Sequence, residues 1–217
     1  MKFMKTIATS TVLMVGMAVS ASAATFGLNT TGGTARSLDA GYSLPVPALP
    51  FEIFDFQGNS NNGSFGGLTV TPGSRLKATY LGSEAGATNG ATLALGGFSF
   101  SNATSAVNDF VIFQNTGVIS FVDLAFTTNN LGGSDTIDND QGTSTDSRLH
   151  IAFTDIRGAI GDVTSVFAFF GDGAGDQDYD DMVIRLDIVP VPVPAAGLLL
   201  LAALGGLTAM RRRRKAA

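Results

Sequence analysis

Apolar side chains recur at every second position in several short segments of this chain, and this pattern constrains its fold most strongly. Within residues 75–81, Leu76, Ala78 and Tyr80 share one face, while the positions between them carry Arg, Lys and Thr side chains. A period of two is typical of a β-strand with one buried face. The chain is therefore expected to bury its core between strands.

Strands of this kind are predicted in nine segments, which are residues 51–56, 67–71, 75–81, 92–100, 110–113, 118–126, 148–153, 163–170 and 182–188. Glycine, with 27 of the 217 residues, punctuates the apolar runs at close intervals. We therefore expect an all-β fold, an antiparallel β-sandwich of jelly-roll-like form. The chain has no cysteine, so its stability must come from packing or bound ions.

The first 23 residues have the pattern of a secretory signal peptide. Two lysines precede the apolar stretch Ile7–Val19, and the small residues Ala21 and Ala23 follow it. We expect this segment to form a signal helix that signal peptidase removes after Ala23. The exported domain would then comprise residues 24–189.

The last segment, residues 190–217, combines a proline-rich strip, an apolar run and a basic end. Residues 195–210 carry no charge, and as a helix they would reach roughly 24 Å, less than the hydrocarbon core of a bilayer. Positive residues beside a span favour the cytoplasmic side. We predict a short transmembrane helix that holds the chain in the inner membrane transiently.

This order of features resembles the PEP-CTERM sorting signal of Gram-negative bacteria, in its Val-Pro-Leu-Pro-Ala variant. The resemblance implies processing by an exosortase, a membrane transpeptidase that passes the protein to the cell surface or the extracellular matrix. A plain C-terminal anchor is the alternative. The residues that carry the signal are Val191, Pro192, Val193, Pro194 and Ala195, followed by Arg211, Arg212, Arg213, Arg214 and Lys215.

Charge is distributed unevenly along the chain. All 18 acidic residues fall within residues 24–189, which contain six basic ones, so the exported domain has a net charge of −12. Such a field repels nucleic acid and attracts divalent cations and basic partners. Nucleic acid is therefore excluded as a partner.

The densest group of carboxylates lies between two predicted strands, in residues 171–181. Carboxylates this close repel one another, and oxygen ligands at alternating positions suit a hard cation such as Ca²⁺. A solvated acidic turn that protects a sheet edge is the alternative. Residue 181 is Asp where an EF-hand requires Gly, so an EF-hand is not expected. The candidate ligands are Asp172, Asp176, Asp178, Asp180 and Asp181.

Residues 176–184 are also similar to the Asp-x-Asp-Tyr-Asn/Asp-Asp-hydrophobic ending of DUF4114, a family of unknown function found in secreted bacterial proteins. Residues 82–89 resemble a loop recurrent in proteins with PEP-CTERM tails, and in this loop Glu84 is expected to be solvated rather than an ion ligand.

A second acidic group is interpreted as a long solvated surface loop. It contains Asp135, Asp138, Asp140 and Asp146.

Catalysis finds little support in the sequence. The single histidine, His150, is predicted to point away from the face of Leu149 and Ile151, and no Gly-x-Ser-x-Gly motif is present. We therefore expect a structural or adhesive protein of the cell surface or the exopolysaccharide matrix rather than an enzyme. The alternative is a Ca²⁺-dependent module that binds glycans or other surface proteins.

Overall fold

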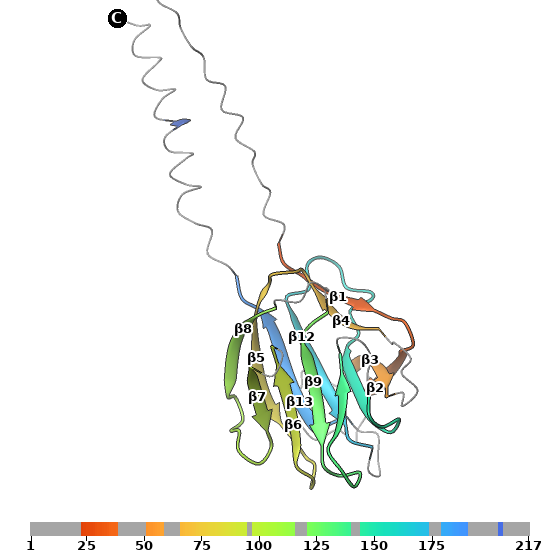
Figure 1. Ribbon diagram of the computed structural model, residues 1–217. Coiled ribbons are helices and arrows are strands. Elements are labelled where there is room, and N and C mark those ends of the chain that lie inside the picture. Colours follow the sequence, from red (N-terminus) through yellow and green to blue (C-terminus); the bar gives the residue numbers. More distant parts are fainter. Residues whose placement is uncertain are drawn as a thin grey trace, which may run out of the picture.

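The computed structural model describes residues 23–38, 51–58, 66–94, 97–115, 121–139, 144–173, 179–190 and 204–205, and shows a domain made of β-strands (Figure 1). The strands within these ranges are β1 Phe26–Asn29, β2 Thr34–Leu38, β3 Phe51–Gln57, β4 Gly67–Val70, β5 Arg75–Gly82, β6 Asn89–Leu93, β7 Phe98–Ser101, β8 Phe110–Gln114, β9 Leu124–Thr128, β10 Asp135–Asp138, β11 His150–Thr154, β12 Ser165–Gly171 and β13 Met182–Ile188.

All strands pair antiparallel and form three sheets. The largest sheet has the order β2-β3-β11-β12-β13-β5-β8, the second has the order β10-β9-β6-β7, and β1 pairs with β4. The hairpins β2–β3, β6–β7, β9–β10 and β12–β13 join neighbours in sequence, whereas the other pairings connect distant segments.

The main core lies between the seven-stranded and the four-stranded sheet. Alternate residues of β12, namely Val166, Ala168 and Phe170, are buried there. The ring of Phe170 stacks on Phe126 of β9, with centroids 5.1 Å apart, so the two sheets are in direct contact. The predicted antiparallel all-β sandwich is therefore confirmed. The predicted inward residues of the segment 75–81 also line this core, together with Leu149 and Ile151.

The outer face of the seven-stranded sheet is also apolar and buried near its middle. Here the side chains of Ile53, Ala152, Phe169 and Val183 form a second cluster with Leu38 and Tyr179. A sheet buried on both faces explains why residues 165–171 form an almost continuous apolar run rather than a strict alternation.

The segment 92–100 is not the single strand that was predicted. It is split by a turn in which the Gly97 N–H donates to the Ala94 carbonyl, and β6 and β7 form a hairpin on either side. The adjacent glycines at positions 96 and 97 are a turn signal that the apolar run concealed.

Three strands were missed, and one was placed too early. The segments β1 and β2 lack a clear alternation, and β10 contains two carboxylates. Of the predicted strand 118–126, residues 118–120 lie outside the described residues. Phe121 makes an isolated bridge to Thr69 of β4, and β9 begins at Leu124.

The domain begins and ends at the same end of the sandwich. The Phe26 N–H donates to the carbonyl of Val163, and the Ile188 N–H donates to the carbonyl of Thr164. The turn between β12 and β13 lies at the opposite end of these strands.

The predicted signal helix and most of the predicted C-terminal helix lie outside the described residues. Of the tail, Leu204 and Gly205 are described, and they are helical. Within the described ranges, no helix has the length and apolar character that a membrane crossing needs.

Candidate functional site at the acidic end of the sandwich

The predicted ion site lies where β12 ends and β13 begins. Of its five candidate ligands, Asp172, Asp180 and Asp181 are described, whereas Asp176 and Asp178 lie outside the described residues. The side chains of Asp172 and Asp180 are 3% and 1% exposed. Carboxylates are rarely buried to this degree unless other groups compensate their charge.

Backbone contacts hold these aspartates next to the strand ends. Asp180 forms a parallel bridge with Phe170, and the Asp172 N–H donates to Asp181 Oδ2 at 2.6 Å. Tyr179, which precedes Asp180, has a φ of 65°, in the left-handed region. The end of the sandwich that carries Asp172, Asp180 and Asp181, called the acidic end below, therefore has a defined backbone geometry on both sides of residues 174–178.

Two asparagines from the other sheet converge on Asp172. The Nδ2 groups of Asn130 and Asn89 lie 3.0 and 3.4 Å from Asp172 Oδ2, and Asn89 Nδ2 also donates to the Asp181 carbonyl at 3.2 Å. These amides help to compensate the buried carboxylate. The sequence offered no signal for them, because their partners are 42 and 83 residues away.

The Asn89 side chain is fully buried, and its Oδ1 atom has no hydrogen-bond donor among the described residues. An unsatisfied buried carbonyl oxygen is costly, so such atoms need a particular explanation. Because the amide of the same side chain contacts Asp172 and Asp181, this oxygen belongs to the acidic end.

The loop Gly82–Asn89 packs against the same end. The Glu84 N–H donates to the Asp180 carbonyl at 2.9 Å, and the Ser83 hydroxyl donates to the carbonyl of Asp181. Asn102 supports the loop, because its Nδ2 donates to the Ala87 carbonyl at 2.7 Å. The aspartates before β13 and the loop Gly82–Asn89, two segments with unrelated sequence patterns, are thus direct neighbours. The side chain of Glu84 is exposed.

Three carboxylates, one buried amide oxygen and several backbone carbonyls therefore gather at one end of the sandwich. Oxygen atoms of these kinds are the ligands that Ca²⁺ takes. Among the described residues, no three Asp, Glu or His side chains converge closely enough to hold a metal ion by themselves.

The second acidic group is not the long loop that was predicted, because Asp135 and Asp138 belong to β10, at one edge of the four-stranded sheet. Thr136 pairs with Thr127 of β9, so backbone hydrogen bonds stabilise this segment despite its acidic side chains. Asp140 lies outside the described residues.

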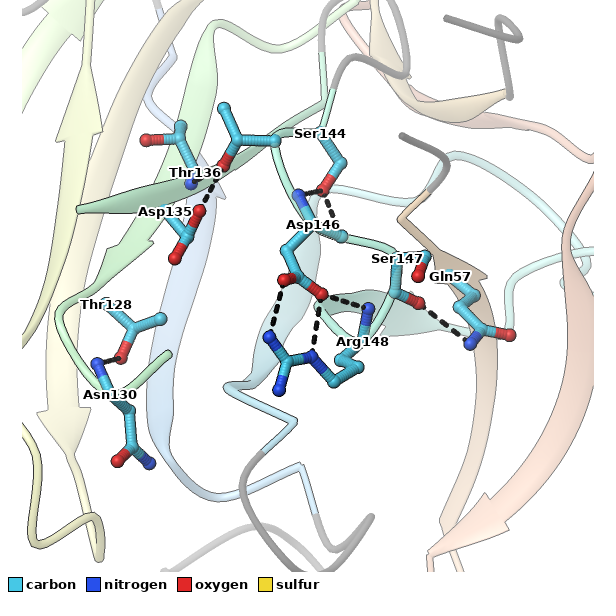
Figure 2. A network of polar contacts seen from close by, with 10 residues as sticks. Gln57, Thr128, Asn130, Asp135, Thr136, Ser144, Asp146, Ser147 and Arg148 are labelled. Atoms are coloured by element: carbon cyan, nitrogen blue, oxygen red, sulfur yellow. Dashed lines mark hydrogen bonds and ion pairs between the residues drawn. The ribbon is translucent and has the colours of Figure 1, made fainter. Parts of the chain in front are cut away.

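The carboxylate of Asp146 forms an ion pair with Arg148 (Figure 2). Its two oxygens accept hydrogen bonds from Arg148 Nε at 2.9 Å and Nη2 at 2.7 Å, and also from the Arg148 N–H. Hydrogen bonds from Arg148 lower the pKa of Asp146 from 3.8 to about 2. This carboxylate is therefore engaged in an ion pair that fixes the chain just before β11.

His150 points away from the face of Ile151, as predicted, and it is buried. Its Nδ1 lies 3.0 Å from Oδ1 of the buried Asp55, which also accepts from Arg36 Nε at 2.8 Å. The ring of Tyr179 meets His150 edge-on, and burial raises the Tyr179 pKa above its ordinary value. This buried hydrogen-bonded group was not predicted from the sequence, although strand alternation places Asp55 on the same face as Ile53.

No family model matches the sequence, and no curated protein matches it. Among solved structures, the chain is similar to the C-terminal domain of the BC2L-C lectin from Burkholderia cenocepacia, with 16% identity and a TM-score of 0.32. The likeness covers 56% of this chain and 91% of that domain.

Proposed function

We propose that the chain is an exported structural or adhesive protein of the cell surface or extracellular matrix, and that its acidic end binds Ca²⁺. Its partners would be exopolysaccharide or other surface proteins. Export, transient anchoring in the inner membrane and processing by signal peptidase and an exosortase are proposed from the terminal segments of the sequence.

The observation that carries the Ca²⁺ proposal is the convergence of buried oxygen atoms around Asp172. Its carboxylate and the unsatisfied Oδ1 of Asn89 belong to side chains that are in contact. The ligand set would comprise Asp172, Asp180 and Asp181 with Asp176 and Asp178 of the same turn. A cation there would offset the mutual repulsion of these carboxylates.

A Ca²⁺ titration of the full chain in mild detergent tests the proposal. We expect thermal unfolding to shift upward between EDTA and millimolar Ca²⁺. At ten times the dissociation constant, binding to the native state alone would add about 1.4 kcal/mol to the free energy of unfolding. No shift at millimolar Ca²⁺ would refute the proposal.

Matched variants locate the site. Asp172→Asn and Asp178→Ala should each remove most of the Ca²⁺-dependent shift, whereas Asp146→Asn, which changes a carboxylate already paired with Arg148, should retain it. Each variant is compared with itself in EDTA, so a general loss of stability is not mistaken for a loss of binding.

Intact-mass measurement of the protein recovered from its host tests the sorting proposal. A mature chain that starts at Ala24 and ends near Val191–Ala195 would support cleavage by signal peptidase and an exosortase. A chain that still ends at Ala217 would indicate a plain membrane anchor instead.

The alternative is a Ca²⁺-dependent module that binds glycans or proteins and is held by that plain anchor. The exposed side chain of Glu84, beside the buried Asp180, favours an acidic end that is accessible to a ligand. Glycan-array binding in Ca²⁺ that disappears in EDTA would support this function over a purely structural one.

A further inference from the structure

Strand β8 forms one edge of the seven-stranded sheet. It pairs with β5 on one side, and Figure 1 shows it as the outermost described element on that side. Unpaired strand edges promote association, and proteins usually block them with charges, prolines or bulges. The edge strand β2 carries Arg36, and β10 carries two aspartates, but β8 has the uncharged sequence Phe-Val-Ile-Phe-Gln.

The register with β5 defines which backbone groups point outward. The Tyr80 N–H donates to the Asp109 carbonyl, and the Asn115 N–H donates to the Ser74 carbonyl. In an antiparallel ladder, hydrogen-bonded pairs alternate with pairs whose polar groups point the other way. Phe110, Ile112 and Gln114 therefore direct their N–H and C=O groups away from β5.

The side chains at this edge are unusually apolar for a surface. Phe110 is 57% exposed and Ile112 is 37% exposed, and the exposed residues Phe98 and Val107 lie on β7 and in the loop before β8. The neighbouring strand β5 adds Lys77, whose Nζ lies 4.4 Å from the centroid of the Phe110 ring.

We propose that two copies of this chain pair through β8, antiparallel and around a two-fold axis at Ile112. The three outward-pointing residues are symmetric about Ile112, so Phe110 of one copy would pair with Gln114 of the other, and Ile112 with itself. Both strands would then satisfy every outward backbone group, and the two sheets would join into one continuous sheet.

The charge distribution is compatible with a second copy at this edge. The domain has a net charge of −12, so most approaches between copies bring carboxylates together. At β8 the nearest carboxylate in sequence, Asp109, would lie opposite Asn115 of the partner. The two Lys77 ammonium groups would be separated by three strand spacings, about 14 Å, which exceeds the screening length at physiological salt.

The antiparallel pairing also defines how the copies are oriented. A two-fold axis across β8 reverses the partner, so the acidic end of one copy lies beside the end of the other where β1 begins and β13 finishes. Copies anchored in the same membrane by their C-terminal segments cannot adopt this arrangement. The pair fits copies displayed on opposing surfaces, or released into a matrix.

Cysteine cross-linking of the full chain in mild detergent tests the pairing, because the natural sequence contains no cysteine. Ile112→Cys places two thiols directly opposite each other, at the roughly 5.5 Å Cα separation that a disulfide spans. We expect most of this variant to run as a disulfide dimer after mild oxidation. Gln114→Cys alone should cross-link little, because its two copies would be offset by four residues.

A mixture of Phe110→Cys and Gln114→Cys chains provides the register control, since these positions face each other and the mixture should form mixed dimers. Light scattering should give twice the chain mass of 22.3 kDa for the unsubstituted protein and a monomer for Ile112→Lys. Equal cross-linking of Ile112→Cys and Gln114→Cys would overturn the proposal, as would a monomeric unsubstituted chain. Melting curves confirm that each variant is folded.

Discussion

Asn130 Nδ2 lies 3.0 Å from Asp172 Oδ2, so a loop that follows β9 in one sheet holds the end of β12 in the other. Asn89 of β6 reaches the same carboxylate oxygen at 3.4 Å. The acidic end therefore depends on the closure of the sandwich, and it is not a property of the β12–β13 turn alone.

Replacing Asn130 by Ala should weaken this closure. The variant loses one hydrogen bond to a charged acceptor, and we expect the free energy of unfolding to fall by about 1–2 kcal/mol. Urea denaturation measures the effect, and the slope of the free energy of unfolding against urea concentration should stay unchanged. Asn129→Ala, which removes an exposed acceptor of the Thr88 N–H, is the matched control and should cost less. A loss at position 130 no larger than at position 129 would contradict the assigned role.

Removing Asp55 should destabilise the domain strongly. Its buried carboxylate forms hydrogen bonds with Arg36 and with the buried His150, and each hydrogen bond to a charged group typically contributes about 1.5–3 kcal/mol. Asp187→Ala breaks the more exposed pair with Arg185 and should cost less than about 1 kcal/mol. Chemical denaturation compares the two, and Asp55→Asn serves as the milder substitution if the alanine variant does not fold.

Asp146 should make stability depend on acid pH. Its pKa is lowered from 3.8 to about 2 in the folded protein. The contribution of a carboxyl with a depressed pKa is complete above its unfolded value, and it is lost as the pH falls through its folded value. Asp146→Asn should therefore lower the melting temperature at pH 7, and this difference should shrink as the pH falls from about 4 to about 2.

The pH series on Asp146→Asn needs a control variant at an exposed carboxyl. Asp162→Asn changes an exposed carboxyl before β12, and we expect the melting temperature to stay close to that of the natural protein throughout the series. If the two variants show the same pH profile, the Asp146–Arg148 pair does not contribute to acid sensitivity.

Ala94 and Gly73 offer a reciprocal test of backbone strain. Ala94 has a φ of 53°, in the left-handed region, so Ala94→Gly should relieve strain and raise the free energy of unfolding by about 0.5–1 kcal/mol. Gly73 has a φ of 77°, and an added Cβ would meet nothing within 4 Å. Gly73→Ala should therefore lower the free energy by a similar amount through strain alone. Thermal unfolding would contradict this account if both changes had the same sign.

The period of two was sufficient to predict the central strands, because their burial is set locally. β5, β11 and β13 alternate between the core and the opposite face, and inward residues such as Leu76 and Ile151 were identified from the sequence. The same rule failed for β2, which has one buried residue, Leu38, after four exposed ones.

The contacts that shape the acidic end could not be predicted from the sequence. Asn89, Asn102 and Asn130 look like ordinary loop residues in the sequence, but in the fold their side-chain amides contact groups 15 to 92 residues away. Such pairings depend on how the sheets close on each other, and the local pattern of a single sequence does not contain this information. The aspartates of the turn could be identified, since their crowding is visible along the chain.

The direction of β12 determines which end of the domain would face outward if the protein were held by its C-terminal side. The described domain ends beside Thr164, while Asp172 lies eight residues further along, just past the far end of β12 and about 26 Å away. A tether beyond Val189 would therefore leave the aspartates at the tip most distant from the point of attachment. At that tip they would be the first part of the domain to meet an approaching surface.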